Sequence, residues 1–140
     1  MRGTCRLFML TGKLIMSRFC LILEPVPLIA KDLATTAREN LGFQPLLATS
    51  EAEALRLMDS LDAAKRIALA FIHDTAAHFQ SSALRPILEA RDTEIVLLGP
   101  DPRSDWPTGA WPALVWPFST DQVLELVASL ETLAQPPKAC

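Results

Sequence analysis

Five short, mostly apolar runs recur along the chain, and each is followed by a proline, a glycine or a polar residue. Continuous apolar runs of this length are typical of strands that are buried on both faces, as in the middle of a parallel sheet. We therefore predict strands over residues 19–23, 45–48, 67–72, 94–98 and 113–116.

The segments between these runs carry helical patterns. Residues 27–41 place apolar side chains on one face among charged ones, and Gly42 ends the pattern. Ser50 with Glu53, and Ser119 with Gln122, have the spacing of a capping box at the start of a helix. Another helix is expected to begin at the serines 81–82. Residues 99–112 contain four prolines and two glycines, so no normal helix is expected there.

Apolar strands that alternate with helices predict a doubly wound α/β fold. Right-handed crossovers and five strands favour a flavodoxin-like parallel sheet of order 2-1-3-4-5, with the fourth helix shortened or missing. We expect an extension over residues 1–18, one domain over residues 19–134 and a tail over residues 135–140. Functional residues in such a sheet lie at the carboxyl ends of strands 1 and 3, here Glu24-Pro25 and His73-Asp74.

The formal net charge of −3 is the sum of two unlike parts of the chain. Residues 1–18 carry four bases and no acid, whereas the remainder has nine bases against sixteen acids. The part of the chain after residue 18 is therefore acidic, and an acidic domain offers no electrostatic basis for nucleic-acid binding. The basic start lacks the uninterrupted apolar run of a signal peptide or membrane span. A disordered extension, a true start at Met16 and an amphipathic membrane-surface arm all stay open.

Three cysteines, Cys5, Cys20 and Cys140, are too few and too scattered for a disulfide framework or a CxxC metal site. Cys20 lies in an apolar run and is expected to be a small core residue. These features favour a reduced, cytoplasmic protein.

Four segments together form a distinctive pattern: Leu21-Ile22-Leu23-Glu24, Pro27-Leu28-Ile29-Ala30, Asp32-Leu33 and Trp116-Pro117-Phe118. In these segments the chain resembles the receiver domain of two-component response regulators, which are CheY-like proteins of bacterial phosphorelay signalling. The resemblance spans about residues 19–133, and it implies a cis peptide bond before Pro117.

Receivers transfer a phosphoryl group from a phosphohistidine to an aspartate at the end of strand 3, with a divalent metal held by acids after strand 1. By this resemblance Glu24 keeps a carboxylate, but Pro25 stands where the main metal-binding aspartate belongs. His73 falls at the acceptor position, Leu98 replaces a Thr or Ser, and Trp116 replaces a Lys. The resemblance therefore implies a degenerate pocket with no metal and no cofactor, which is not phosphorylated by the family mechanism.

Two other arrangements around this pocket are possible. If the strand register slips by one residue, Asp74 becomes the acceptor, with Mg²⁺ bound at Glu24. The two histidines, His73 and His78, could instead suggest a metal cluster, but their spacing is no zinc signature. We favour a strand-end histidine and a loop histidine.

Trp106, Trp111 and Trp116 recur every five residues, a spacing that is neither helical nor that of alternate strand positions. Tryptophans are enriched in interface hot spots, and an exposed group of them indicates a partner. We expect Trp116 to be buried over the lost polar site. For Trp106 and Trp111, burial and a partner face remain equally open.

These observations favour a signalling or scaffold module without enzymatic activity, which binds a protein partner or itself through residues 99–130. The first alternative is a working receiver that uses Asp74 and Mg²⁺. The second is a small flavodoxin-like enzyme or cofactor-binding protein. The loop after strand 1, Glu-Pro-Val-Pro, argues against the second, because it has no glycine and no hydroxyl to hold a cofactor phosphate.

Overall fold

The computed structural model describes residues 18–62, 65–99 and 111–130. These residues form five strands and five helices, all predicted from the sequence except one helix. In chain order they are β1 (Arg18–Leu23), α2 (Pro27–Glu39), β2 (Gln44–Ala48), α3 (Glu51–Ser60), β3 (Arg66–His73), α4 (Ala76–Gln80), α5 (Leu84–Ala90), β4 (Glu94–Gly99), β5 (Ala113–Val115) and α6 (Thr120–Ser129).

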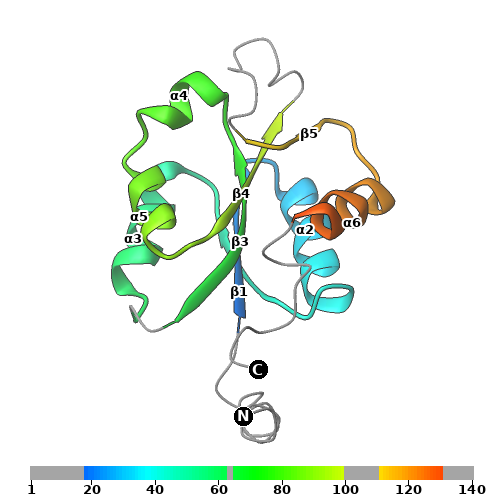
Figure 1. The fold of residues 1–140 in the computed structure, drawn as a ribbon, viewed down its shortest axis with the longest axis horizontal. Coiled ribbons are helices and arrows are strands. Elements are labelled where there is room, and N and C mark those ends of the chain that lie inside the picture. The colour runs from blue at the N-terminus through cyan, green and yellow to red at the C-terminus, as the bar shows by residue number, and fades with distance from the viewer. Residues whose placement is uncertain (1–17, 63–64, 100–110, 131–140) are drawn as a thin grey trace, which may run out of the picture.

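The five strands form one parallel sheet of order β2-β1-β3-β4-β5, which confirms the predicted flavodoxin-like topology. Helices cover both faces of the sheet: α2 and α6 lie on one side, and α3, α4 and α5 lie on the other (Figure 1). This arrangement leaves β1 and β3 inside the sheet, and all but their end residues are buried.

Each face of the sheet has its own hydrophobic core. Side chains alternate along β1, so Leu21 packs on the α3 side whereas Cys20 and Ile22 pack on the α2 side. All three are fully buried, as the continuous apolar run predicted. Burial also raises the pKa of the Cys20 thiol, because the apolar interior disfavours the thiolate.

Side-chain caps begin most of the helices. The Ser50 hydroxyl accepts a hydrogen bond from the Glu53 N–H at 3.2 Å, and Ser119 and Gln122 form the full reciprocal box at 3.1 and 2.8 Å. Helix α5 begins at Leu84, two residues after the predicted serine pair, and its cap position, Ala83, makes no side-chain bond. The Ser82 hydroxyl nevertheless accepts from the Leu84 N–H at 3.0 Å.

Helix α4 was missed by the sequence analysis, which placed only a loop between His73 and the serine pair. It has five residues, too few to show a hydrophobic period. Its start is nevertheless capped, because the Thr75 hydroxyl accepts from the His78 N–H at 3.2 Å.

Several predictions from the sequence lie outside the described residues. These are residues 1–17 of the expected extension, the tail over 135–140, the last residues of the expected domain (131–134), the shortened or missing helix within 100–110, and the residues Cys5, Trp106 and Cys140. Across the ranges that are described, no helix has the length and apolar character needed to cross a membrane.

The burial of β1 gives a matched pair of stability predictions. Leu21→Ala is expected to lower the free energy of unfolding by about 2–5 kcal/mol, because it opens a cavity at a fully buried site. Leu47→Ala removes the same atoms from a side chain that is 48% exposed, and is expected to cost about 0.5 kcal/mol or less. Urea denaturation of both variants measures the difference, and equal losses would contradict the two-sided burial of β1.

Candidate functional site

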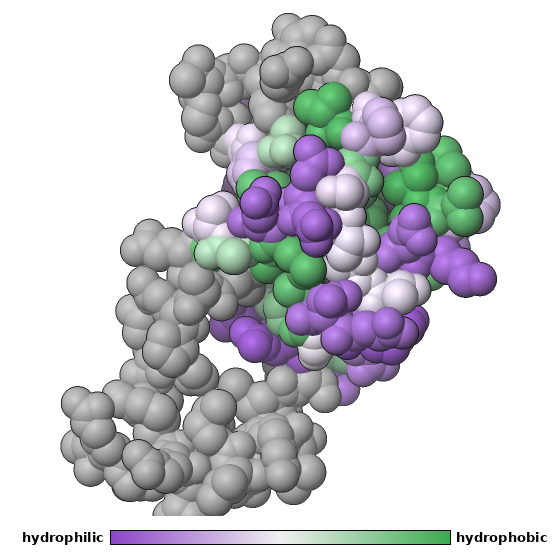
Figure 2. Space-filling view, turned by 90° about the vertical axis from the view of Figure 1, so that its right-hand side faces the viewer, coloured by the Kyte–Doolittle hydropathy of each residue, from purple (hydrophilic) through white to green (hydrophobic). Residues whose placement is uncertain are grey.

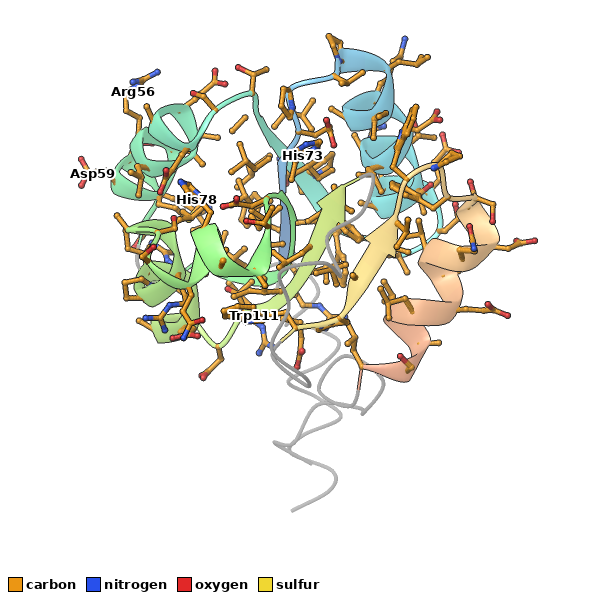
Figure 3. All side chains as sticks on the ribbon, turned by 90° about the horizontal axis from the view of Figure 1, so that it is seen from above. Arg56, Asp59, His73, His78 and Trp111 are labelled. Carbon is orange, nitrogen blue, oxygen red and sulfur yellow. The ribbon has the colours of Figure 1, made fainter. Side chains whose placement is uncertain are left out.

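The carboxyl ends of β1 and β3 lie side by side, as the sequence analysis required of a functional site. Leu23 pairs with Ile72, so the next residues, Glu24 and His73, are neighbours across the two strands. His73 in turn pairs with Leu98 on β4. Seen from above, His73 lies close to the middle of this edge of the sheet (Figure 3).

Glu24 and His73 form a hydrogen-bonded pair at this edge. The distance between Glu24 Oε1 and His73 Nδ1 is 3.0 Å. The Glu24 side chain is 1% exposed, and that of His73 is 36% exposed. A carboxylate can only accept, so Nδ1 donates its proton to Glu24 whether the imidazole is neutral or charged. His73 thereby satisfies a carboxylate that is otherwise costly to bury.

The second oxygen of Glu24 is also occupied. Glu24 Oε2 accepts a hydrogen bond from the Val26 N–H at 3.0 Å, at the residue that caps α2. Pro27 follows at the first helical position, where the missing N–H of a proline costs no hydrogen bond. The loop after β1 therefore turns its backbone donor inward to the carboxylate.

The site does not fit the divalent metal of receiver chemistry. Mg²⁺ requires oxygen ligands in near-octahedral geometry. Both oxygens of Glu24 are bonded within the protein, Pro25 offers no ligand, and His73 presents nitrogen where the family has a carboxylate. Among the described residues, no group of three His, Cys, Asp or Glu side chains could hold a metal ion.

Asp74 lies one residue beyond the end of β3, and its carboxylate makes contacts at the start of α4. Its Oδ1 accepts from the Thr75 N–H at 2.8 Å, and its Oδ2 lies 2.8 Å from His78 Nδ1. The hydrogen bond to Asp74, followed by its charge, raises the pKa of the exposed His78. His73, Asp74 and His78 line a hollow of about 210 Å³ together with residues 49–51 at the start of α3.

Leu98 and Pro117 take their expected places in the fold. Leu98 is 1% exposed and packs in the core on the α2 side, where its side chain has no hydrogen-bonding group. The Trp116–Pro117 peptide bond is cis, as the resemblance implied.

The prediction that Trp116 is buried over the polar site is wrong. The backbone N–H of Trp116 donates to the Gly99 carbonyl at 2.7 Å, but the residue is 49% exposed. Side chains alternate along the short edge strand β5, so Trp116 falls on the same face as Leu114. At that position the ring lines a groove between α2 and α6, away from the hollow beside His73 and Asp74.

Trp111 lies on the other face of the sheet. Its ring makes an edge-to-face contact with Phe79 of α4, with 5.2 Å between the centroids and 80° between the planes. It packs, partly buried, against the core on the α3 side. Trp111 and Trp116 therefore do not form one aromatic cluster, and their regular spacing in the sequence has no structural counterpart.

The groove beside Trp116 was not found from the sequence. It has a volume of about 240 Å³, and residues of α2, of the connection 116–119 and of α6 line it. The helical pattern counted Leu28 among the buried apolar positions, yet this side chain is 72% exposed. The buried stripe of α2 runs through Ala30, Leu33, Ala34 and Ala37, and Leu28 lies outside it.

The Glu24–His73 pair leads to a stability prediction. His73→Ala leaves a buried carboxylate oxygen without its donor, so it is expected to lower the free energy of unfolding by on the order of 3 kcal/mol. His78→Ala removes an imidazole that is 66% exposed, and a change within about 1 kcal/mol is expected. Denaturant titration at one pH compares the two, and a larger loss for His78→Ala would contradict the assignment.

The Asp74–His78 contact predicts a pH dependence. The folded chain holds the His78 pKa above its ordinary value, so the contact stabilises the fold at low pH. This contribution is lost as the pH rises through the raised pKa. Asp74→Asn should return the pKa of His78 toward its ordinary value, measured by NMR titration of the ring protons. Asp32→Asn on the opposite side of the sheet is the control, and an unchanged His78 pKa in Asp74→Asn would refute the contact.

No protein-family model and no curated protein matches the chain. Solved structures do. SdrG from Sphingomonas melonis Fr1 is 25% identical with a TM-score of 0.61, over 86% of this chain and 98% of SdrG. The receiver domain of the response regulator PhyR from Erythrobacter litoralis is 21% identical with a TM-score of 0.64, over 90% and 98% of the two chains. The chemotaxis protein CheY4 from Vibrio cholerae is 15% identical with a TM-score of 0.56, over 79% and 95%.

These alignments extend over nearly the whole of each neighbour, and the strand order and the cis bond before Pro117 agree with the resemblance found in the sequence. The chain has the fold of the receiver domains of response regulators.

Proposed function

We propose that this chain is a receiver-type module of two-component signalling that acts through protein–protein contacts and is not phosphorylated on aspartate. The observation that carries the proposal is the Glu24–His73 hydrogen bond at the carboxyl ends of β1 and β3. By the resemblance to receivers, a metal ligand and the phosphoryl acceptor would be expected at these two positions. A cytoplasmic location would follow from this role.

Aspartyl phosphorylation requires a carboxylate acceptor and a cation that neutralises the phosphoryl oxygens. Here the strand-end side chain is an imidazole whose Nδ1 donates to Glu24. Leu98 and Trp116 cannot supply the hydroxyl and the ammonium group that hold the product in the family. A phosphoryl group beside the buried Glu24 carboxylate would also meet like charge.

Asp74 is a poor substitute for the missing acceptor. Its two oxygens are held by the Thr75 N–H and by His78, next to the Thr75 cap of α4. Phosphorylation of one of these oxygens would displace the contact that this oxygen makes and would remove the carboxylate charge that faces His78. The contacts therefore support a structural role for this carboxylate.

The loop after β1 argues against a flavodoxin-like cofactor site. Cofactor phosphates are bound by backbone N–H groups and hydroxyls at the start of a helix. Pro25 and Pro27 have no N–H, and the Val26 N–H between them already donates to Glu24. The Glu24 N–H donates to the Ala48 carbonyl, so residues 24–27 have no backbone N–H left to offer a phosphate.

The neighbours support a role in signalling by contact with proteins. PhyR from Bartonella quintana, a structural neighbour with 24% identity and a TM-score of 0.51, is described as an anti-anti-sigma factor. SdrG, 27% identical in a second structure, has been solved in a BeF₃-activated conformation. This chain has the same fold, but its residues at the carboxyl ends of β1 and β3 do not favour that activation chemistry.

The proposal is tested by phosphate incorporation. The full chain is incubated with Mg²⁺ and a small-molecule donor such as acetyl phosphate, and its intact mass is measured. We expect labelling far below one phosphate per chain, and no change in the amide NMR spectrum on addition of BeF₃⁻ with Mg²⁺. SdrG serves as the positive control for the BeF₃⁻ arm. Stoichiometric labelling that is lost in Asp74→Asn but kept in His78→Asn would overturn the proposal.

A further inference from the structure

An apolar patch lies where the start of α2 meets the connection from β5 to α6. Three large apolar side chains reach the surface there: Val26 is 44% exposed, Leu28 72% and Trp116 49%. The space-filling view of this side shows apolar atoms at the surface among charged ones (Figure 2). We call Val26, Leu28, Trp116 and the adjoining groove the α2–α6 patch.

The patch contains both a projection and a recess. Leu28 and Trp116 stand at the rim of the groove of about 240 Å³, and Ile29, Leu33, Phe118 and Val123 lie among its lining residues. In an interface with two-fold symmetry, each copy presents the same patch to the other, so a projection on one must fit a recess on the other. In the α2–α6 patch, Leu28 is the projection and the groove is the recess, so the patch can pair with a copy of itself.

The charges beside the patch favour a second copy of α2. Lys31 and Asp32 are both exposed, one turn after Leu28, and within the described ranges neither takes part in an ion pair. If two α2 helices pack antiparallel about an axis between residues 31 and 32, each Lys31 faces an Asp32. The same register sets Leu28 of each copy opposite Thr35, next to Thr36 of the groove.

The α6 side of the patch has a different charge pattern. Asp121 and Glu125 are exposed on this helix, and α6 carries no base. Two copies that met through α6 would bring like charges together, which is unfavourable. The two-fold axis therefore lies over α2, whose adjacent opposite charges complement themselves.

We infer that the α2–α6 patch is a homodimer interface, in which Leu28 of each copy enters the groove of the other and Lys31 pairs with Asp32 across the axis. This inference rests on the proposed function and deepens it by naming the protein partner as a second copy of this chain.

The test is a charge swap, followed by sedimentation equilibrium of the full chain over a range of concentrations. Lys31→Asp and Asp32→Lys should each weaken dimerisation at least about tenfold, because each reversal acts twice across the axis. The double variant Lys31→Asp/Asp32→Lys restores both pairs and should recover the dimer. Leu28→Asp should abolish it, whereas Leu47→Asp, on an exposed apolar residue of β2, should leave it intact.

A chain that stays monomeric at every concentration would overturn the inference, whether or not a different protein binds the patch. A double swap that fails to recover the dimer, or a Leu47→Asp variant that dissociates as Leu28→Asp does, would also overturn it. Circular dichroism of each variant checks that it is folded. Phosphate labelling tests the proposed function separately, since its result does not depend on the oligomeric state.

Discussion

The central pair of strands, β1 and β3, is buried on both faces, and its parallel register determines where the site residues lie. Leu23 pairs with Ile72, so the residues that leave the apolar interior at the same edge, Glu24 and His73, must meet. A carboxylate at that edge is 1% exposed and needs a donor for each oxygen. His73 supplies one and the Val26 N–H supplies the other.

This hydrogen bonding connects the site to the surface beside it. The Val26 N–H that serves Glu24 belongs to the residue that starts α2, and Pro27 continues the helix directly. The loop is therefore short, and it leaves Val26 and Leu28 outside the buried stripe of the helix. Across the groove, Trp116 follows β5 on the face of the sheet that α2 and α6 cover. The hydrogen-bonded Glu24 and the exposed apolar patch thus lie at the two ends of the same short loop and helix start.

Much of the fold could be predicted from the sequence, because its signals are local. The apolar runs predicted the five strands, and the serine caps predicted the starts of α3 and α6. Helix α4 has only five residues and no periodic signal, so it was missed. Its neighbour Asp74, left open as an acceptor, is instead bonded to Thr75 and His78 at the start of that helix.

The sequence by itself determined which residues follow the two central strands at their carboxyl ends, since apolar strands of this length have few alternative arrangements in a parallel sheet. Only the tertiary structure decided what those residues do. The contact between Glu24 and His73 spans 49 positions of the chain, and it depends on the register of two strands, which no local pattern encodes. The exposure of Trp116 and Leu28 likewise depends on how closely α6 approaches α2. That distance is set by side chains packed from separate elements, and it leaves a groove beside Trp116, which the sequence predicted to be buried.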